Sequence, residues 1–291
     1  MLFRSLRLGQ KAGDLILSAS AKPLPEWRRF RAGSMSMRLA AVLATVWVLS
    51  WMLDVLRIDL ERLPGLFERI GMVLSRRYWP PELSHVVTPE FIDAIIDTFQ
   101  MSYVATVVGL LLAVPLSWFA SFNMTPDRRV LYPVCRLFIM ACRSVHEMIW
   151  TIILVAVVGF GMLPGTLAMT LFCIGFGGKL MAEAIEAIRK GPVEAVRATG
   201  AGHWQIFVFG VLPQVRVAWA GIAIYTWDVV FRASTVVGFF GAGGMGHYLR
   251  ESVQTVQSRQ VSAIILTIVA IVIVAELLSA WVRKRIAQAA A

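Results

Sequence analysis

The stretch 261–282 limits the possible folds of this chain more than any other feature. Glu276 is its only charged residue. A helix needs about 20 predominantly apolar residues to cross the hydrocarbon core of a bilayer. Within that core the backbone must satisfy its own hydrogen bonds, which a helix does within a single segment. The stretch therefore predicts a membrane-spanning helix.

Similar apolar runs recur along the whole chain. Hydrophobic residues make up 58% of the sequence and charged residues 16%, whereas soluble domains average about 45–50% and about 25%. The expected spans are 39–56, 98–122, 131–158, 166–188, 215–237 and 261–282. We therefore expect an all-α integral membrane protein with about six transmembrane helices.

The segments between and beyond the spans suggest how the chain is organised. Apolar residues recur at helical spacing from 63 to 74 with charged residues between them, which predicts a helix lying in the membrane interface. The expected parts are a basic cytoplasmic N-terminal segment (1–37), a first transmembrane helix (38–57), an extracytoplasmic stretch with the interfacial helix (58–90), a transmembrane domain (91–285) and a C-terminal tail (286–291). No internal repeat is visible in the sequence.

Basic residues gather beside the first and last spans, and the net charge is +10. They are Arg4, Arg7, Lys11, Lys22, Arg28, Arg29, Arg31 and Arg38 at one end, and Arg283, Lys284 and Arg285 at the other. Basic clusters next to apolar spans mark cytoplasmic flanks. We therefore expect a multi-pass membrane protein with both termini cytoplasmic, in contact with the lipid bilayer and with no nucleic acid.

The polar stretch after the first span counts against this orientation. It would place basic residues outside, partly balanced by acidic ones. These residues are Arg57, Arg62, Arg69, Arg76 and Arg77, with Asp59, Glu61, Glu68 and Glu82.

Two short motifs resemble nucleotide-binding sequences without completing them. "GAGGMG" at 241–246 matches the dinucleotide fingerprint, but it follows an apolar span and not a strand of a βαβ unit. We expect a gate or hinge loop formed by Gly241, Gly243, Gly244 and Gly246. "GFGGKL" departs from a phosphate loop, because Cys173 and Leu180 replace the glycine and the hydroxyl residue that it needs.

No arrangement of residues typical of catalysis is visible. "HEMIW" at 146–150 lacks the second histidine of a zinc-protease helix. Cys135, Cys142 and Cys173 have no metal-ligand spacing and are expected to pack in apolar segments. We therefore expect that the chain is not an enzyme and carries no metal or cofactor of its own.

The polar segment 191–213 stands between two apolar spans. Pro192 suits a first helical turn, Glu194 is expected near the positive end of the helix dipole, and Gly200 can end the helix in a left-handed conformation. A second amphipathic piece follows and is expected to end at Leu212 and Pro213. A helix–glycine–helix with exposed apolar residues fits the groove of a partner. An ordinary interhelical loop is an equally good interpretation on these grounds alone.

At these residues the chain resembles the permease subunits of ATP-binding-cassette (ABC) importers. Their cytoplasmic motif reads Glu-Ala-Ala, a glycine after three further residues, and Ile-x-Leu-Pro after nine more. The matching positions are Glu194, Ala195, Val196, Gly200, Gly210, Leu212 and Pro213. Val196 replaces the second alanine of the motif, and Gly210 replaces its isoleucine.

Further stretches resemble the phosphonate-import branch of that family. They are "YWPPELS", "ACRSVHEMIW", "KLMAEAIEAIRKGPVEAVRATGA", "GVLPQV" and "FRASTVVGFFGAGGMG". The resemblance implies a type I ABC importer permease fold with 191–213 as a cytoplasmic coupling helix. It also implies a permease homodimer, two separate ATP-binding subunits that hold ATP and Mg²⁺, and an extracytoplasmic substrate-binding protein. The substrate implied is phosphonate, phosphite or a related phosphorus oxyanion. The location implied is the cytoplasmic (inner) membrane of a bacterium.

Two opposite-charge pairs lie within expected spans, Arg143 with Glu147 and Asp228 with Arg232. Intramembrane charges usually face a partner or a cavity, and each pair has the i,i+4 spacing at which the two charges can neutralise each other. Alternatively, either arginine contacts the anion in transit, since a guanidinium suits phosphorus oxyanions. The candidate substrate pathway comprises Arg143, Glu147, Asp228, Arg232, Ser234 and Thr235.

Three other classes of protein remain open. A methionine-type ABC permease shares the Gly200 and Leu212–Pro213 elements. An ion-coupled secondary transporter needs intramembrane carboxylates, and Glu147, Asp228 and Glu276 are available, although such transporters usually show a repeat. A membrane-embedded enzyme lacks its catalytic residues here.

Overall fold

The computed structural model describes residues 32–56 and 64–289. It divides into two compact units, residues 1–67 and 68–291. In the first unit, α2 (Ala32–Val55) corresponds to the expected first span and begins ahead of residue 38. Its apolar window, 35–55, is long and apolar enough to cross a membrane. Most of the expected basic segment falls outside the described residues.

The second unit begins within α3 (Leu66–Val73) and is helical wherever it has regular structure among the described residues. Its further elements are the π-helical η2 (Leu74–Tyr78), the 3₁₀-helical η3 (Leu83–Val87), α4 (Pro89–Phe119), α5 (Leu131–Ser144), α6 (Glu147–Val158), α7 (Met162–Glu186), α8 (Lys190–Ala198), α9 (His203–Gln205), the π-helical η4 (Ile206–Val211), α10 (Leu212–Val237), the π-helical η5 (Gly238–Ala242), α11 (Gly244–Gln254) and α12 (Ser258–Ala289). The all-α fold class is therefore confirmed.

The expected third span, 131–158, is two helices and not one. α5 and α6 are bent by 87° at their junction. Val145 is extended, and His146 caps α6, because its Nδ1 accepts a hydrogen bond from the Met148 amide at 3.4 Å. The apolar composition continues across this break, so composition alone could not reveal it. Among the described residues, five helices are long and apolar enough to cross a membrane, or up to six if the bent pair forms one span.

Small residues let the central helices of the second unit approach closely. A side chain at Gly109 of α4 would collide with Cys173 of α7, and one at Gly177 would collide with Leu110. Close packing of small residues is a main source of helix association within lipid. The glycines of "GFGGKL" therefore serve helix packing, and the three cysteines are buried and unpaired as expected.

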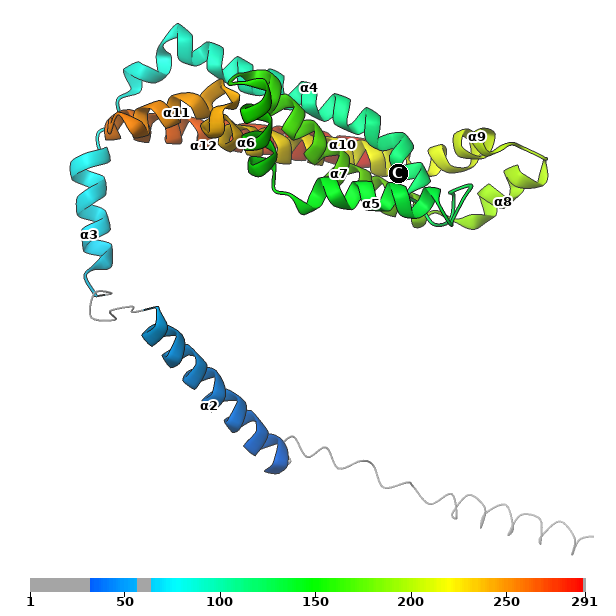
Figure 1. Ribbon diagram of the computed structural model, residues 1–291, viewed down its shortest axis with the longest axis horizontal. Helices are drawn as coiled ribbons and strands as arrows, with labels where there is room; N and C mark the ends of the chain where they lie inside the picture. The colour runs from blue at the N-terminus through cyan, green and yellow to red at the C-terminus, as the bar shows by residue number, and fades with distance from the viewer. Residues whose placement is uncertain (1–31, 57–63, 290–291) are drawn as a thin grey trace, which may run out of the picture. The chain divides into compact units, whose positions relative to one another are not determined.

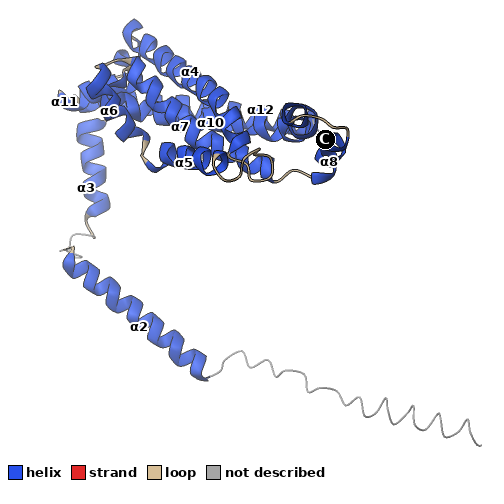
Figure 2. Ribbon diagram, turned by 45° about the vertical axis from the view of Figure 1, so that its right-hand side comes forward, coloured by secondary structure: helices blue, strands red, loops and turns tan. Residues whose placement is uncertain are grey.

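Short helices lie at opposite ends of this helical bundle (Figures 1 and 2). α8 and α9 extend from one end, where the C-terminal end of α12 also lies, and α11 lies at the other end (Figure 1). α12 continues as a helix to Ala289, so most of the expected tail 286–291 belongs to the last helix. Hereafter the end with α8 is called the coupling end, and the end with α11 is called the distal end.

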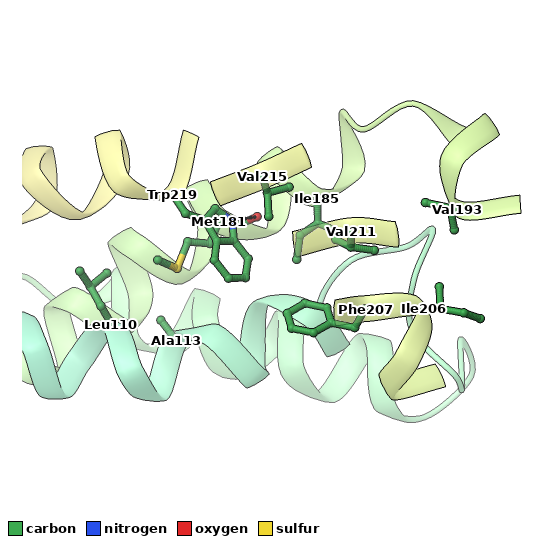
Figure 3. Packing of buried hydrophobic residues seen from close by; sticks show 10 residues of the cluster. All are labelled: Leu110, Ala113, Met181, Ile185, Val193, Ile206, Phe207, Val211, Val215 and Trp219. Atoms are coloured by element: carbon green, nitrogen blue, oxygen red, sulfur yellow. Dashed lines mark hydrogen bonds between the residues drawn. The ribbon is translucent and has the colours of Figure 1, made fainter. Parts of the chain in front are cut away.

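The largest group of buried apolar residues joins the coupling end to the long helices (Figure 3). Val193 of α8 and Phe207 of η4 belong to it together with Ile185 of α7 and Val215 of α10. The remaining members shown are Leu110, Ala113, Met181, Ile206, Val211 and Trp219. The short polar helices are therefore anchored in the same core as the bundle.

Candidate functional site

α8 exposes the motif residues that sequence comparison singles out. Val193 is its one buried residue, whereas Glu194 and Ala195 are exposed. The helix ends before Gly200, whose φ of +80° lies in the left-handed region, as expected. A Cβ at Gly200 would have no neighbour within 4 Å. The conformation, and not crowding, therefore favours glycine here.

One expectation about this segment is wrong. Glu194 does not lie in the first turn of α8, because the helix begins at Lys190, ahead of Gly191 and Pro192. The second piece, α9 with η4, ends at Val211, and α10 begins at Leu212, as expected. The helical backbone continues across this junction, from His203 to Ala242. Proline is tolerated there because it occupies the first turn of α10.

Gln214 ties the start of the coupling segment to the start of α10. Its side-chain oxygen accepts from the Arg189 amide at 3.1 Å, and its Nε2 donates to the carbonyl oxygens of Arg189 at 3.3 Å and Gly210 at 2.8 Å. Arg189 is the residue just before α8. Sequence reasoning missed Gln214, because nothing in its neighbours predicts a contact 25 residues away.

A stacked aromatic cluster joins the second piece to the bundle. The Trp118 ring of α4 lies 4.7 Å from the Phe207 ring, and the Trp204 ring lies 5.7 Å from it. The indole of Trp219 in α10 donates to the Met181 carbonyl of α7 at 3.3 Å. η4 therefore contacts α4 and α10 through the Phe207 ring, and Trp219 joins α10 to α7.

A second polar link joins α5 and α7 near the coupling end. The Glu186 carboxylate accepts from Arg136 Nη2 at 2.6 Å and from the Phe122 amide at 2.9 Å. Asn123 Nδ2 donates to the Ile185 carbonyl at 2.9 Å. These bonds fix the 120–130 connection against the end of α7.

A small cavity of about 230 Å³ separates that connection from α8. Arg128, Lys190, Glu194 and Arg197 are among its lining residues. The charged residues of its lining are therefore mainly basic, with Glu194 as the acidic member. It lies at the segment expected to meet a partner subunit.

The Asp228–Arg232 pair forms as its spacing predicts. Arg232 Nη2 lies 2.8 Å from Asp228 Oδ2. The two partners differ in environment, because the Asp228 side chain is 5% exposed and that of Arg232 is 49% exposed. Asp228 holds one side of the guanidinium from within the bundle and leaves the other side accessible.

The Arg143–Glu147 pair does not form. Arg143 ends α5 and Glu147 begins α6, so the bend between the two helices separates them. Glu147 instead lies 3.3 Å from His146 Nδ1. Arg143 is exposed and has no ion-pair partner among the described residues. The i,i+4 rule assumes a continuous helix, which is absent here.

Ser234 and Thr235 are buried, and their hydroxyl groups are used within their own helix. Ser234 Oγ donates to the Phe231 carbonyl at 2.7 Å, and Thr235 Oγ1 donates to the Arg232 carbonyl at 2.8 Å. The structure therefore does not bring these two hydroxyls to the accessible side of Arg232.

The glycine-rich turn packs at the distal end. Gly241, Gly243 and Gly244 have φ values of +106°, +81° and +66°. A side chain at Gly246 would collide with the Thr235 carbonyl and with the Phe239 amide. The turn begins α11, so the expected loop is a closely packed junction. The role of these glycines as a hinge or gate stays a prediction.

α11 is fastened to α4 beside this turn. The buried Thr98 Oγ1 accepts from the Met245 amide at 2.9 Å. The Tyr248 ring contacts the Phe91 ring at 5.6 Å. Burial, and secondarily the carboxylate of Glu90, raises the pKa of Tyr248.

The fold resembles the permease in inward-facing structures of the MetNI methionine ABC transporter, with a TM-score of 0.58 and 19% identity over 68% of this chain and 96% of that one. It also resembles a chain of a bacterial ABC transporter involved in alginate import, with a TM-score of 0.58 and 15% identity over 85% and 99% of the two chains. At these identities the likeness shows the fold alone.

Residues 105–288 match the family described as the inner membrane component of binding-protein-dependent transport systems. The chain belongs to this family. The expected family and type I importer-permease fold are therefore confirmed.

Two relatives extend the comparison beyond the fold. The phosphite transport system permease PtxC of Stutzerimonas stutzeri is 39% identical over 258 residues, which cover 89% of this chain and 90% of that protein. The phosphate-import permease PhnE of Mycolicibacterium smegmatis is 37% identical over 76% of this chain and 41% of its own length.

Proposed function

We propose that this chain forms the translocation pathway of an ATP-driven importer for phosphite, phosphonate or a related phosphorus oxyanion. The observation that carries the proposal is the 39% identity to a phosphite permease, which extends over 90% of that relative's length. The accessible guanidinium of Arg232 supports an anionic substrate, because its fork geometry matches phosphorus oxyanion oxygens.

The proposed assembly contains two copies of this chain and two ATP-binding subunits. ATP and Mg²⁺ bind to those subunits, and this chain carries out no chemistry. An extracytoplasmic binding protein delivers the substrate to the distal end. Both termini lie in the cytoplasm with α8. The common location of α8 and the end of α12 supports the placement of the C-terminus (Figure 1).

The coupling step begins at α8. Its exposed Glu194 and Ala195 contact the ATP-binding subunit, while the buried Val193 and the Gln214 bonds hold α8 to the bundle. Closure of the ATP-binding subunits moves α8, and the aromatic cluster carries the displacement to the long helices. The pathway then changes between inward-open and outward-open states.

Arg232 supplies a transient charge in this pathway. Asp228 orients the guanidinium when the pathway is empty, and it competes with the substrate for the same donor groups. This competition keeps the site weak, as rapid release requires.

Uptake by the reconstituted complex tests the proposal. The complex is placed in proteoliposomes with its binding protein, and uptake of phosphite, methylphosphonate and methionine is measured with and without ATP. We expect ATP-dependent uptake of a phosphorus oxyanion and no methionine uptake. Methionine uptake would identify a methionine-type permease. Uptake driven by an ion gradient without ATP would identify a secondary transporter. Either result would reject the proposed function.

A further inference from the structure

Two neighbouring cavities lie between η2 and the start of α12, away from the substrate pathway described above. The first, called the apolar groove, has a volume of about 550 Å³, and Leu74, Trp79, Ile265 and Leu266 are among its lining residues. The second, called the basic pocket, has a volume of about 520 Å³, and its lining includes Arg76, Arg77, Glu82 and Arg259. The two cavities differ sharply in the chemistry of their walls.

The same two elements build both cavities. Arg77 Nε donates to Ser258 Oγ at 2.8 Å, and both residues line the basic pocket. Ser262 Oγ donates to the Tyr78 carbonyl at 2.7 Å, and both residues line the apolar groove. On η2, Arg77 lines the pocket and the next residue, Tyr78, lines the groove. On α12, Ser258 lines the pocket, and Ser262, one turn further along, lines the groove. The two cavities therefore lie next to each other along the start of α12.

The basic pocket has guanidinium groups available for an anion. The side chains of Arg76 and Arg259 make no ion pair or hydrogen bond among the described residues, and both are exposed. Glu82 is the acidic residue in the lining, and it forms no ion pair within the described part of the chain. Three arginines facing one carboxylate leave the pocket with a net positive charge. Guanidinium forks match phosphate oxygens in geometry as well as charge.

The aromatic residues place the boundary between the cavities at the membrane surface. Tyr78 and Trp79 line the groove beside the basic pocket, and the Trp79 residue is 65% exposed. Tyrosine and tryptophan concentrate at the headgroup level of bilayers. α12 begins there at Ser258, and Leu266 lies about 12 Å further along it at about 1.5 Å per residue. The groove therefore descends from the headgroup level toward the hydrocarbon core.

We propose that this junction binds an anionic phospholipid. Its phosphate lies at Arg76, Arg77 and Arg259, and one acyl chain occupies the apolar groove along α12. A free phosphorus oxyanion offers the same headgroup chemistry, but it would leave the adjoining groove empty. The lipid fills both cavities and secures η2 against α12 at the membrane surface.

Lipid binding to the purified transporter complex tests this site. The probes are dioleoyl phosphatidylglycerol and the zwitterionic dioleoyl phosphatidylcholine, with binding measured by native mass spectrometry after delipidation. We expect a preference for phosphatidylglycerol. Arg76→Gln with Arg259→Gln should weaken its binding about thirty-fold, at roughly five-fold for each basic residue near a membrane surface. The control is Arg69→Gln, which changes an exposed arginine of α3 that lines neither cavity.

A second pair of variants tests the groove without changing charge. Leu266→Trp should fill the groove and displace the lipid, whereas Leu277→Trp changes an exposed leucine further along α12 and should not. Arg76→Lys with Arg259→Lys should keep most of the preference, and recovery of the intact complex on size exclusion shows that each variant folds.

Three results would overturn the lipid site. The first is equal binding of the two lipids, unaffected by any variant. The second is phosphite displacing phosphatidylglycerol and still binding to Leu266→Trp, because the pocket would then be a free-oxyanion site. The third is quantitative disulfide cross-linking of Leu266→Cys to Trp47→Cys of α2, because protein and not lipid would then fill the groove. None of these measurements depends on which substrate is transported.

Discussion

Gly200 and Gly191 are both exposed glycines of the coupling segment, with open space around each, yet only Gly200 has a left-handed backbone. A β-branched residue in that conformation is a genuine outlier, because its Cβ is forced against the backbone. The two glycines therefore form a matched pair in which conformation differs and crowding does not.

We predict that Gly200→Val uncouples transport and that Gly191→Val does not. The expected result for Gly200→Val is normal membrane insertion with uptake reduced at least about ten-fold, because a misdirected α8 cannot seat in its partner. Gly200→Asn should retain most activity, since asparagine tolerates the left-handed region. Uptake and ATP hydrolysis are measured in proteoliposomes. Wild-type uptake by Gly200→Val would contradict the coupling role.

The Asp228–Arg232 pair calls for a neutral replacement and not a charge swap. The Asp228 side chain is 5% exposed, so an arginine there would bury an extended cation. Asp228→Asn with Arg232→Gln keeps a hydrogen-bonding pair of similar size. If Arg232 serves the substrate, this variant should assemble normally and lose at least about ten-fold in kcat/KM, the effect of one charge-assisted hydrogen bond. Arg232→Lys should lose less. Near-normal kcat/KM in the neutral pair would make the bridge purely structural.

At the scale of elements, the coupling segment depends on links that join α8 to α10. Gln214 makes three hydrogen bonds across the Arg189 turn and to Gly210. Val193 packs in the core that η4 and α10 share with α7. These links hold α8 to the same core as the long helices, which the proposed coupling role requires.

We predict that Gln214→Leu separates ATP hydrolysis from transport. The leucine side chain is one atom shorter and can neither donate nor accept the three hydrogen bonds. The complex should assemble and hydrolyse ATP, while substrate imported per ATP falls several-fold. The control is Gln288→Leu, an exposed position near the end of α12. An unchanged amount of substrate imported per ATP in Gln214→Leu would show that the Gln214 hydrogen bonds do not transmit the movement of α8.

At the scale of the whole chain, membrane topology follows from which ends share a surface. α8 and the end of α12 lie at the coupling end of the bundle (Figure 1). The exposed Ser84 belongs to η3, just before α4, and lies at the opposite, distal end of the same bundle. Whichever way the bundle is oriented in the membrane, Ser84 and the end of α12 therefore lie on opposite sides of it.

Cysteine labelling in intact cells tests this orientation. In a background without Cys135, Cys142 and Cys173, Ser84→Cys should react with a membrane-impermeant maleimide added from outside. Gln288→Cys should react only after the membrane is opened. The reverse pattern would place α8 outside and would exclude a cytoplasmic ATPase partner.

The sequence by itself determined the class of this protein, because long apolar runs and a spaced polar motif are local signals. The runs predicted the helices, the motif predicted the family, and Gly200 predicted the end of α8. Local spacing also predicted the Asp228–Arg232 bridge, since both residues lie within one uninterrupted helix.

Only the tertiary structure decided the features that join distant residues or interrupt a uniform composition. The 87° bend after Ser144 separates Arg143 from Glu147 although the apolar pattern continues through it. Gln214 finds its partner across a turn, and the arginines of η2 meet α12 more than 170 residues away, as the Arg77–Ser258 bond shows with a separation of 181. Hydropathy reports whether a residue enters lipid. It carries no information about which buried partner the residue meets, because that depends on how the helices pack.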